Sequence, residues 1–391
     1  MPLLDTEPGE RAGELYVNMG PQHPSTHGVL RLMVRLEGEV ITECTLHMGY
    51  LHRGSEKLAE KRTYPQYVTL TDRDDYLAAM MNNQVYVQAV ERLMNLEVPE
   101  RAEYLRVIVM ELNRISSHLV WLGTFAMDLG AQTVFLYCFR EREHLMRMFE
   151  EICGARMTFS YMRIGGVAWD IPDESWGQNI RHWLNGSGRY AVDAGGDAAH
   201  GGFPVLMDEC DRLLTGNQIF LFRTQGVGVL PLDKAIDLSC SGPMIRGSGL
   251  DFDVRRAEPY SVYDRFEFDI PTRPEGDCFA RYLVRLEEMR QSRRILLQAL
   301  DQIPEGPIMG KVGKMIKPPA GEAYSRVESP RGLLGGYLVS DGKSQSPYRY
   351  HVRAPSFCNL KAMSPMAIGW KIADTIAILG SIDIVLGDVD R

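Results

Sequence analysis

Residues 99–130, PERAEYLRVIVMELNRISSHLVWLGTFAMDLG, form the stretch that decides the fold class. Proline stands at the expected first turn of a helix, where its missing N–H is not needed, and the helical pattern ends near Gly130. The residues before it place Met80, Met81 and Val85 at helical spacing as well. We interpret the two methionines as plain core, because methionine commonly fills gaps in packed interiors. Residues 54–155 as a whole therefore predict a buried helical bundle.

Strand patterns flank this bundle on the N-terminal side. Residues 14–48 tend to alternate apolar and polar side chains, and EGEV at 37–40 supplies a turn. Further helices are expected at about 173–190 and 203–223, with a Gly/Ala-rich loop between them in which His200 is expected to be exposed. A short helix is expected in PLDKAIDLS, residues 231–239.

The C-terminal part of the chain mixes both element types. A long helix is predicted at 277–303, strands at 332–341 and 347–355, and a helix near 365–378. The fold class is therefore α+β: a mainly α-helical bundle body with an N-terminal antiparallel β lobe and a small C-terminal β/α lobe. We divide the chain into residues 1–53, 54–303 and 304–391 accordingly.

Composition and charge exclude several classes of protein. The chain has 391 residues, of which 45% are hydrophobic, and 43 Lys and Arg stand against 51 Asp and Glu. The net charge of −8 offers no basic field to a nucleic acid. We expect no signal peptide, since the N-terminus lacks a basic start followed by an apolar run. No apolar run reaches the ~18 residues of a membrane span, so any contact with a membrane would be made through partners.

The seven cysteines lie far apart and form no CxxC pair. This spacing argues against a zinc ribbon, a local iron–sulfur ligand set and a thioredoxin motif. Without an export signal, reduced and buried thiols are the simplest interpretation.

The loop GPQHPSTHG, residues 20–28, joins the first two predicted strands and contains His23 and His27. Its residues leave three interpretations open: a metal clamp, a proton donor, or a turn held by local side-chain hydrogen bonds. The HxxxH spacing suits a metal only on a helix, which proline and glycine disfavour here. Ser25 and Thr26 can bond nearby backbone groups, whereas an imidazole on a loop often belongs to a functional site.

Two acidic positions require an explanation. The segment TDRDDY, residues 71–76, places four charges directly before an apolar helix, and we expect Asp72 or Asp74 to cap that helix. Tyr76 can bury its ring and still present a donor hydroxyl.

Asp128 lies in an apolar neighbourhood and needs a partner, which could be a histidine, an arginine or a helix N-terminus.

A resemblance covers nearly the whole chain, from about residue 14 to 391. It rests on GPQHPSTHGVLRL, GYLHRGSEKL, RDDY, MDLGAQT, FREREHLMRMFEEICGARM, RIGGV, RGSGLDFDVRR, GDCFARYLVRLEEMRQS, YLVSDG and DIVLGDVDR, which occur in this order. Together they resemble the hydrogenase-like quinone-site subunit of respiratory complex I, which is the D-type subunit of the bacterial complex. That subunit is similar to the large subunit of nickel–iron hydrogenases, so the resemblance implies a fold of that kind.

The hydrogenase metal ligands are absent from this chain. The hydrogenase motif RxCGxC corresponds to RDDYLA, with Asp75 and Ala78 at the cysteine positions. The motif DPCxxCxxH corresponds to DIVLGDVDR, with Val385 and Asp388 at the cysteines and Arg391 at the histidine. Because no thiolate remains, soft-metal chemistry is not expected, and we predict no metal in this chain.

The resemblance implies a cavity in which quinone is reduced to quinol. By motif, Tyr76 matches the tyrosine that bonds one carbonyl oxygen of the quinone head group, His27 contacts the other side of the head group, and Asp128 pairs with that histidine. His27, Tyr76 and Asp128 are therefore the expected catalytic residues, with His23 as a structural member of the loop. Arg53, with His52 beside it in the HRG motif, is expected near the iron–sulfur cluster of a partner.

The implied substrate is menaquinone or ubiquinone, and the implied complex is a proton-translocating NADH:quinone oxidoreductase. Electrons would come from a tetranuclear iron–sulfur cluster in the B-type small subunit. C-type and I-type subunits of the peripheral arm and the H-type subunit of the membrane arm are the other expected partners. The chain would be a peripheral protein on the cytoplasmic side of the cell inner membrane, and unstable alone. We hypothesise that the charge change left by proton donation moves the loop and drives proton pumping.

Two departures from the family pattern carry further expectations. Some relatives have a histidine after GGV near the cluster, where this chain has Ala168 and Trp169. We predict a cluster potential that is low and nearly independent of pH, which suits menaquinone. The chain is also short between KMIKPP and GEAYSRVE, which raises the alternative of a complex I-like enzyme whose donor is ferredoxin or a reduced deazaflavin. A non-catalytic scaffold and a hydrogenase-type large subunit are the remaining alternatives.

Overall fold

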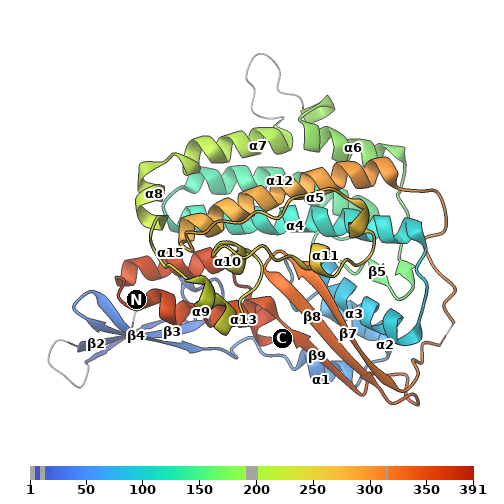
Figure 1. Ribbon diagram of the computed structural model, residues 1–391, viewed down its shortest axis with the longest axis horizontal. Coiled ribbons are helices and arrows are strands. Elements are labelled where there is room, and N and C mark those ends of the chain that lie inside the picture. Colours follow the sequence, from blue (N-terminus) through green and yellow to red (C-terminus); the bar gives the residue numbers. More distant parts are fainter. Residues whose placement is uncertain (1–4, 9–13, 191–200, 314) are drawn as a thin grey trace.

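The computed structural model describes residues 5–8, 14–190, 201–313 and 315–391 (Figure 1). His200, for which we expected exposure, lies outside these residues. Helices predominate and three small antiparallel sheets accompany them, which confirms the α+β class.

Long helices make up the body of the molecule. Figure 1 shows α4, α5 and α12 running alongside one another, with α6 and α7 covering one side. Residues 99–130 contain α4, which begins directly after Pro99 and ends at Asp128, as predicted. The bounds of the main helices are α3 Ala79–Met94, α4 Glu100–Asp128, α5 Gln132–Cys153, α6 Glu174–Asn185, α7 Gly202–Cys210 and α12 Cys278–Gln302.

Two sheets lie below this body in Figure 1. The N-terminal sheet has the order β1-β2-β3-β4, and its strands are Asp5–Pro8, Glu14–Met19, Arg31–Glu37 and Val40–His47. The C-terminal sheet has the order β7-β8-β9, with strands Gly321–Ser329, Gly332–Ser340 and Arg349–Arg353. Strands β1 and β7 were not predicted. The third sheet is the short hairpin of β5 Met162–Arg163 and β6 Gly166–Val167.

The predicted helix near 365–378 is wrong as a single element. The chain forms α14 at Met363–Ala367 and α15 at Ile372–Ile382 instead. Gly369 between them has a φ of 86°, and Lys371 is extended, so the helical hydrogen-bond ladder is interrupted there. The other helices are α1 Ser55–Ala59, α2 Tyr64–Thr71, α8 Gln218–Thr224, α9 Leu232–Asp237, α10 Pro243–Arg246, α11 Val254–Ala257, α13 Pro355–Leu360 and α16 Leu386–Asp390.

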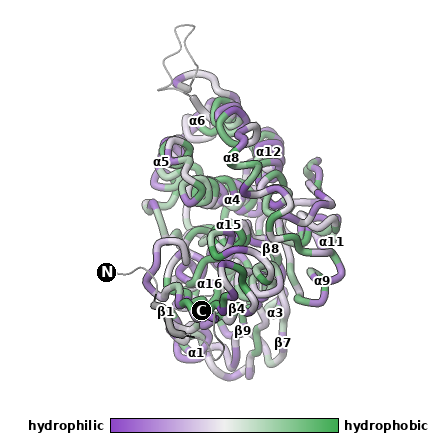
Figure 2. Tube along the Cα trace, turned by 90° about the vertical axis from the view of Figure 1, so that its left-hand side faces the viewer, coloured by the Kyte–Doolittle hydropathy of each residue, from purple (hydrophilic) through white to green (hydrophobic). Residues whose placement is uncertain are grey.

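The core consists of two hydrophobic clusters. The larger one joins the long helices to strands β7–β9 and contains Met80 and Met81, both with no exposed surface, as predicted for plain core. The smaller one joins the N-terminal sheet to the helices near the C-terminus. Figure 2 shows these apolar segments running through the interior, with α15 between α4 and α16. Each cluster combines residues from more than one of the three predicted parts of the chain, whose boundaries stay a prediction.

The cysteines of the described residues are all free thiols, five of them buried. Among the residues that the structure describes, no helix is both long and apolar enough to cross a membrane.

Candidate functional site

The histidine loop connects β2 to β3 and is folded by its own side chains. Pro24–Thr26 form one 3₁₀ turn, and the Nδ1 atom of His23 accepts a hydrogen bond from the Ser25 N–H at 3.2 Å. The buried Thr26 hydroxyl donates to the His23 carbonyl at 2.8 Å. His27 follows in the left-handed region with a φ of 53°. His23 therefore holds the loop, as expected, and the turn presents His27.

His27 meets Asp128 across the fold. The Nε2 atom of His27 lies 2.8 Å from Oδ2 of Asp128, the last residue of α4. The two side chains are 13% and 12% exposed, so both are screened from water. This contact answers which partner Asp128 has: of the alternatives that the sequence left open, it is a histidine.

Tyr76 completes a cavity of about 270 Å³ with this pair. Its polar lining comes from His27, Tyr76, Thr124, Asp128 and Asp383, and its other lining residues are Pro24, Leu77, Val120, Trp121, Met127, Ile384 and Val385. Burial and the charge of Asp75 raise the pKa of Tyr76, while Arg331 and Arg53 act in the opposite direction. The tyrosine is therefore a protonated donor at neutral pH. The cavity has mainly apolar walls and a few polar groups, among them the Tyr76 hydroxyl and the His27 imidazole, which is typical of a small-molecule site.

The segment before α3 differs from the prediction in its capping residue. Neither Asp72 nor Asp74 caps that helix, whose N-cap is Ala78 without a side-chain hydrogen bond. Asp75 closes the turn before it, because its Oδ1 accepts the N–H groups of Leu77 and Ala78 at 3.1 and 3.2 Å. Asp72 instead ends α2. Asp74 is turned away and accepts a hydrogen bond from the Ser55 hydroxyl at 3.1 Å. Burial raises the pKa of Asp74 to about 7.

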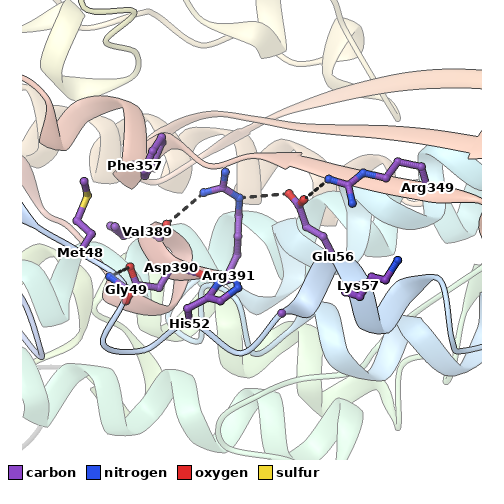
Figure 3. Close-up of a pocket in the computed structure, with 11 residues that line it drawn as sticks. Met48, Gly49, His52, Glu56, Lys57, Arg349, Phe357, Val389, Asp390 and Arg391 are labelled. Atoms are coloured by element: carbon purple, nitrogen blue, oxygen red, sulfur yellow. Dashed lines mark hydrogen bonds and ion pairs between the residues drawn. The ribbon is translucent and has the colours of Figure 1, made fainter.

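His52 and Arg53 line other cavities than the one with Tyr76. His52 belongs to a hollow of about 460 Å³, drawn in Figure 3, where its Nδ1 atom lies 2.5 Å from the Asp390 carbonyl oxygen. In the same figure Glu56 accepts from both Arg391 and Arg349. Arg53 is 3.6 Å from Asp74 and lines a smaller hollow beside it. Both residues are thus separate from the cavity of His27, and their place near a partner's cluster stays a prediction.

Sequence reasoning missed two members of the cavity region. Asp383 lines the cavity, and the fully buried Arg331 binds both Asp383 and Asp75. The sequence signal that could have identified them is the set of aspartates in RDDYLA and DIVLGDVDR. If these two segments pack together in the interior, their carboxylates require a buried cation between them. No group of three or more His, Cys, Asp or Glu that could hold a metal ion occurs among the described residues.

Comparison with known proteins now identifies the family. The sequence model of the family described as respiratory-chain NADH dehydrogenase, 49 kDa subunit, matches residues 128–318 and 311–391. The chain belongs to this family. This confirms the resemblance stated from the motifs alone.

Curated relatives extend the match over almost the entire chain. The D-type subunit of the NADH-quinone oxidoreductase of Desulforamulus reducens is 55% identical over 96% of this chain and 98% of the relative. The corresponding NADH-quinone oxidoreductase subunit of Dehalococcoides mccartyi is 54% identical with the same coverage of both chains. That of Geobacillus kaustophilus is 52% identical over 97% of this chain and 99% of the relative. The match thus covers nearly the whole length of each relative, and the alternative donor stays a prediction.

Proposed function

We propose that this chain is the quinone-site subunit of an NADH:quinone oxidoreductase and that the cavity of His27, Tyr76 and Asp128 receives the quinone head group. The observation that carries the proposal is the meeting, in one cavity, of a protonated tyrosine and a histidine paired to a carboxylate. These residues come from positions 27, 76 and 128, in three different parts of the fold. Membership of the family supports quinone reduction as the reaction, and the cavity is the proposed place where the quinone head group binds.

The residues of the cavity suit proton donation at both sides of a quinone ring. Reduction to quinol takes up two electrons and two protons. The Tyr76 hydroxyl would donate one proton to one carbonyl oxygen and keep the O–H electron pair as tyrosinate. His27, whose Nε2 atom lies 2.8 Å from Asp128, would donate the other proton. Donors at hydrogen-bond distance from the oxygens are what general acid catalysis requires.

The electrons would come one at a time from the tetranuclear cluster of the B-type small subunit. C-type, I-type and H-type subunits are the further proposed partners, with this chain peripheral on the cytoplasmic side of the inner membrane. Proton pumping would follow from movement of the histidine loop after proton donation. We keep menaquinone as the favoured substrate, on the basis of Ala168 and Trp169, and NADH as the donor, on the basis of the relatives' names.

The decisive experiment uses membranes with the assembled complex carrying Tyr76→Phe. Quinone reduction is followed beside reduction of a hydrophilic acceptor that takes electrons upstream of quinone. We expect quinone reduction to fall by about a hundredfold, the usual contribution of a general acid, while the hydrophilic acceptor is reduced at the normal rate. Tyr86→Phe is the matched control, since the buried Tyr86 hydroxyl donates to the Tyr64 carbonyl at 3.2 Å and does not line the cavity.

The outcomes separate the proposal from a scaffold role. If Tyr76→Phe reduces quinone at the full rate, Tyr76 is structural and the scaffold interpretation gains. If both activities are lost, assembly has failed, and His27→Gln replaces Tyr76→Phe in the same comparison. An His27→Gln complex that keeps full quinone activity would then count against the proposed site.

A further inference from the structure

One buried guanidinium connects two of the chain segments that line the proposed quinone cavity, the one with Tyr76 and the one with Asp383. Arg331 lies between β7 and β8 and has no exposed surface. Its Nη1 atom is 2.8 Å from Asp75 Oδ2 and donates to the Ser117 hydroxyl at 3.1 Å. Its Nη2 atom is 3.3 Å from Asp383 Oδ1. Arg331 is thus bonded to the residue before Tyr76 and to a residue of the opposite segment.

Asp75 links Arg331 to the turn that carries Tyr76. One carboxylate oxygen of Asp75 binds Arg331, and the other accepts the N–H groups of Leu77 and Ala78. The turn that carries Tyr76 is therefore closed by a carboxylate whose own position is fixed by the guanidinium. A planar fork with several donors can hold two carboxylates at once, which a lysine ammonium on a flexible stem cannot do with the same geometry.

Asp383 links Arg331 to the segment at the end of α15. It ends α15 in the left-handed region with a φ of 62°, and it is followed by Ile384 and Val385, which also line the cavity. Its Oδ2 atom has no hydrogen-bond partner, and the nearest cation there is Arg285, whose Nε atom is 3.9 Å away. Arg285 itself donates to the carbonyls of Ser381 and Ile382. The end of α15 therefore depends on Arg331 for the only close hydrogen bond to the Asp383 carboxylate among the described residues.

The charges around Arg331 also affect Tyr76. Asp75 precedes α3, Asp383 ends α15, Asp388 lies on α16 and Arg285 on α12, and all of them act on Arg331 or on its partners. Arg331 and Arg53 lower the pKa of Tyr76 against the opposing effects of burial and Asp75. Of these two cations, Arg331 is fully buried, whereas Arg53 is 42% exposed and screened by water.

We propose that Arg331 is a positioning residue of the quinone site, which locks the Tyr76 turn against the Asp383 segment and stabilises Tyr76 as tyrosinate. The inference rests on the proposed function and deepens it. When the O–H bond of Tyr76 breaks, the proton goes to a carbonyl oxygen of the quinone. The quinone itself would be reduced by electrons from the partner's cluster. The electron pair stays on the phenolate oxygen, and the fixed guanidinium charge balances it.

The test compares Arg331→Gln and Arg331→Lys in the assembled complex. We expect kcat for quinone to fall about tenfold or more in Arg331→Gln and less in Arg331→Lys, with KM within about threefold of wild type. Incorporation of a fluorinated tyrosine at position 76 supplies a more acidic phenol. It should recover a large part of the lost kcat in Arg331→Gln, because it replaces the missing stabilisation of the tyrosinate.

Arg106→Gln is the matched control. Arg106 is also fully buried, and its Nη2 atom is 2.6 Å from Glu91 Oε1, but unlike Arg331 it bonds no residue that lines the cavity. Any loss of activity in that variant should be unchanged by the fluorinated tyrosine. If Arg331→Gln does not assemble, the same comparison is made in Arg331→Lys.

Two results would overturn the inference. One is an assembled Arg331 variant whose quinone kcat is within twofold of wild type. The other is a loss of kcat that the fluorinated tyrosine leaves unchanged. The Tyr76→Phe complex distinguishes failure of this inference from failure of the proposed function. Full quinone activity in Tyr76→Phe would count against the proposed quinone site. A loss of quinone activity in Tyr76→Phe together with fully active Arg331 variants would refute only the role of Arg331.

Discussion

The helical body and the cavity region both bury carboxylates, but they compensate them differently. In the body, Glu111 accepts hydrogen bonds from Arg114, Arg255, Tyr263 and Ser292. Burial alone would raise the pKa of Glu111, but the two arginines outweigh it and lower that pKa to about 2. In the segments beside the cavity, whose lining includes neither Asp74 nor Asp388, burial dominates instead and raises the pKa of Asp74 to about 7 and that of Asp388 to about 6.

The geometry explains the difference. Asp74, Asp383 and Asp388 each keep one buried oxygen without a hydrogen-bond partner, whereas both oxygens of Glu111 are bonded. A carboxylate with both oxygens bonded to cations and hydroxyls, as in Glu111, holds its charge at all physiological pH values. Under-paired carboxylates can take up and release protons near neutral pH, and such groups gather at functional sites. The comparison thus separates buried charge that supports the fold from buried charge available for chemistry.

The largest expected effect breaks the network of the body. Arg255→Met leaves Asp253 without its closest cation and Glu111 with Arg114 alone, and removal of one partner of a buried pair costs about 3–5 kcal/mol. We expect little assembled complex in the membranes and a clearly lower thermal midpoint for what remains. Arg147→Met, at an exposed pair with Glu143, is the control that should change neither quantity. An Arg255→Met complex of normal stability would show that the body does not depend on this pairing.

A second change sharpens the comparison through pH. The unfolded Asp74 loses its proton near its ordinary pKa of 3.8, whereas the folded one holds it up to about pH 7. The stability that this group contributes is complete below pH 4 and is lost as the pH rises to 7, by up to about 4 kcal/mol. Asp74→Asn should remove that loss, so its thermal midpoint should fall less between pH 5 and pH 8 than that of wild type.

Asp173→Asn is the matched control for this measurement. Asp173 is exposed and caps α6, and the hydrogen bonds from Ser175 lower its pKa. Its titration therefore lies below the measured window, and the slope between pH 5 and pH 8 should stay that of wild type. An equal slope in Asp74→Asn and wild type would contradict the raised pKa of Asp74.

The smallest expected effect concerns the cavity pair itself. Asp128→Asn keeps the shape and one hydrogen bond to His27 but removes the charge. The difference between a charge-assisted and a neutral hydrogen bond is about 1.5 kcal/mol, which corresponds to a loss of roughly tenfold in kcat for quinone. The hydrophilic acceptor should be reduced normally and the thermal midpoint should change little. If Asp128→Asn prevents assembly and does not merely lower kcat, Asp128 has a structural role and not a role in the quinone site.

Much of the fold follows from local patterns. The long helices were predictable because the apolar spacing of residues 99–130 and its neighbours persists over many turns. Strand β7 was missed because three small residues of the tail, Gly321, Ala323 and Ser325, give it little alternation. The break between α14 and α15 was missed because the apolar pattern continues through Gly369.

The sequence by itself determined the α+β class, the family and the three candidate residues of the cavity, since motifs and periodicity are local and survive in any context. Only the tertiary structure decided which charges meet. Composition and spacing left the partner of Asp128 open, and only the motif resemblance pointed to His27. Neither the patterns nor the motifs indicated that Asp75 closes the turn before α3, or that Arg331 joins two aspartates from distant parts of the chain. Whether a carboxylate is compensated depends on long-range contacts and on burial, and both exist only after the chain has packed.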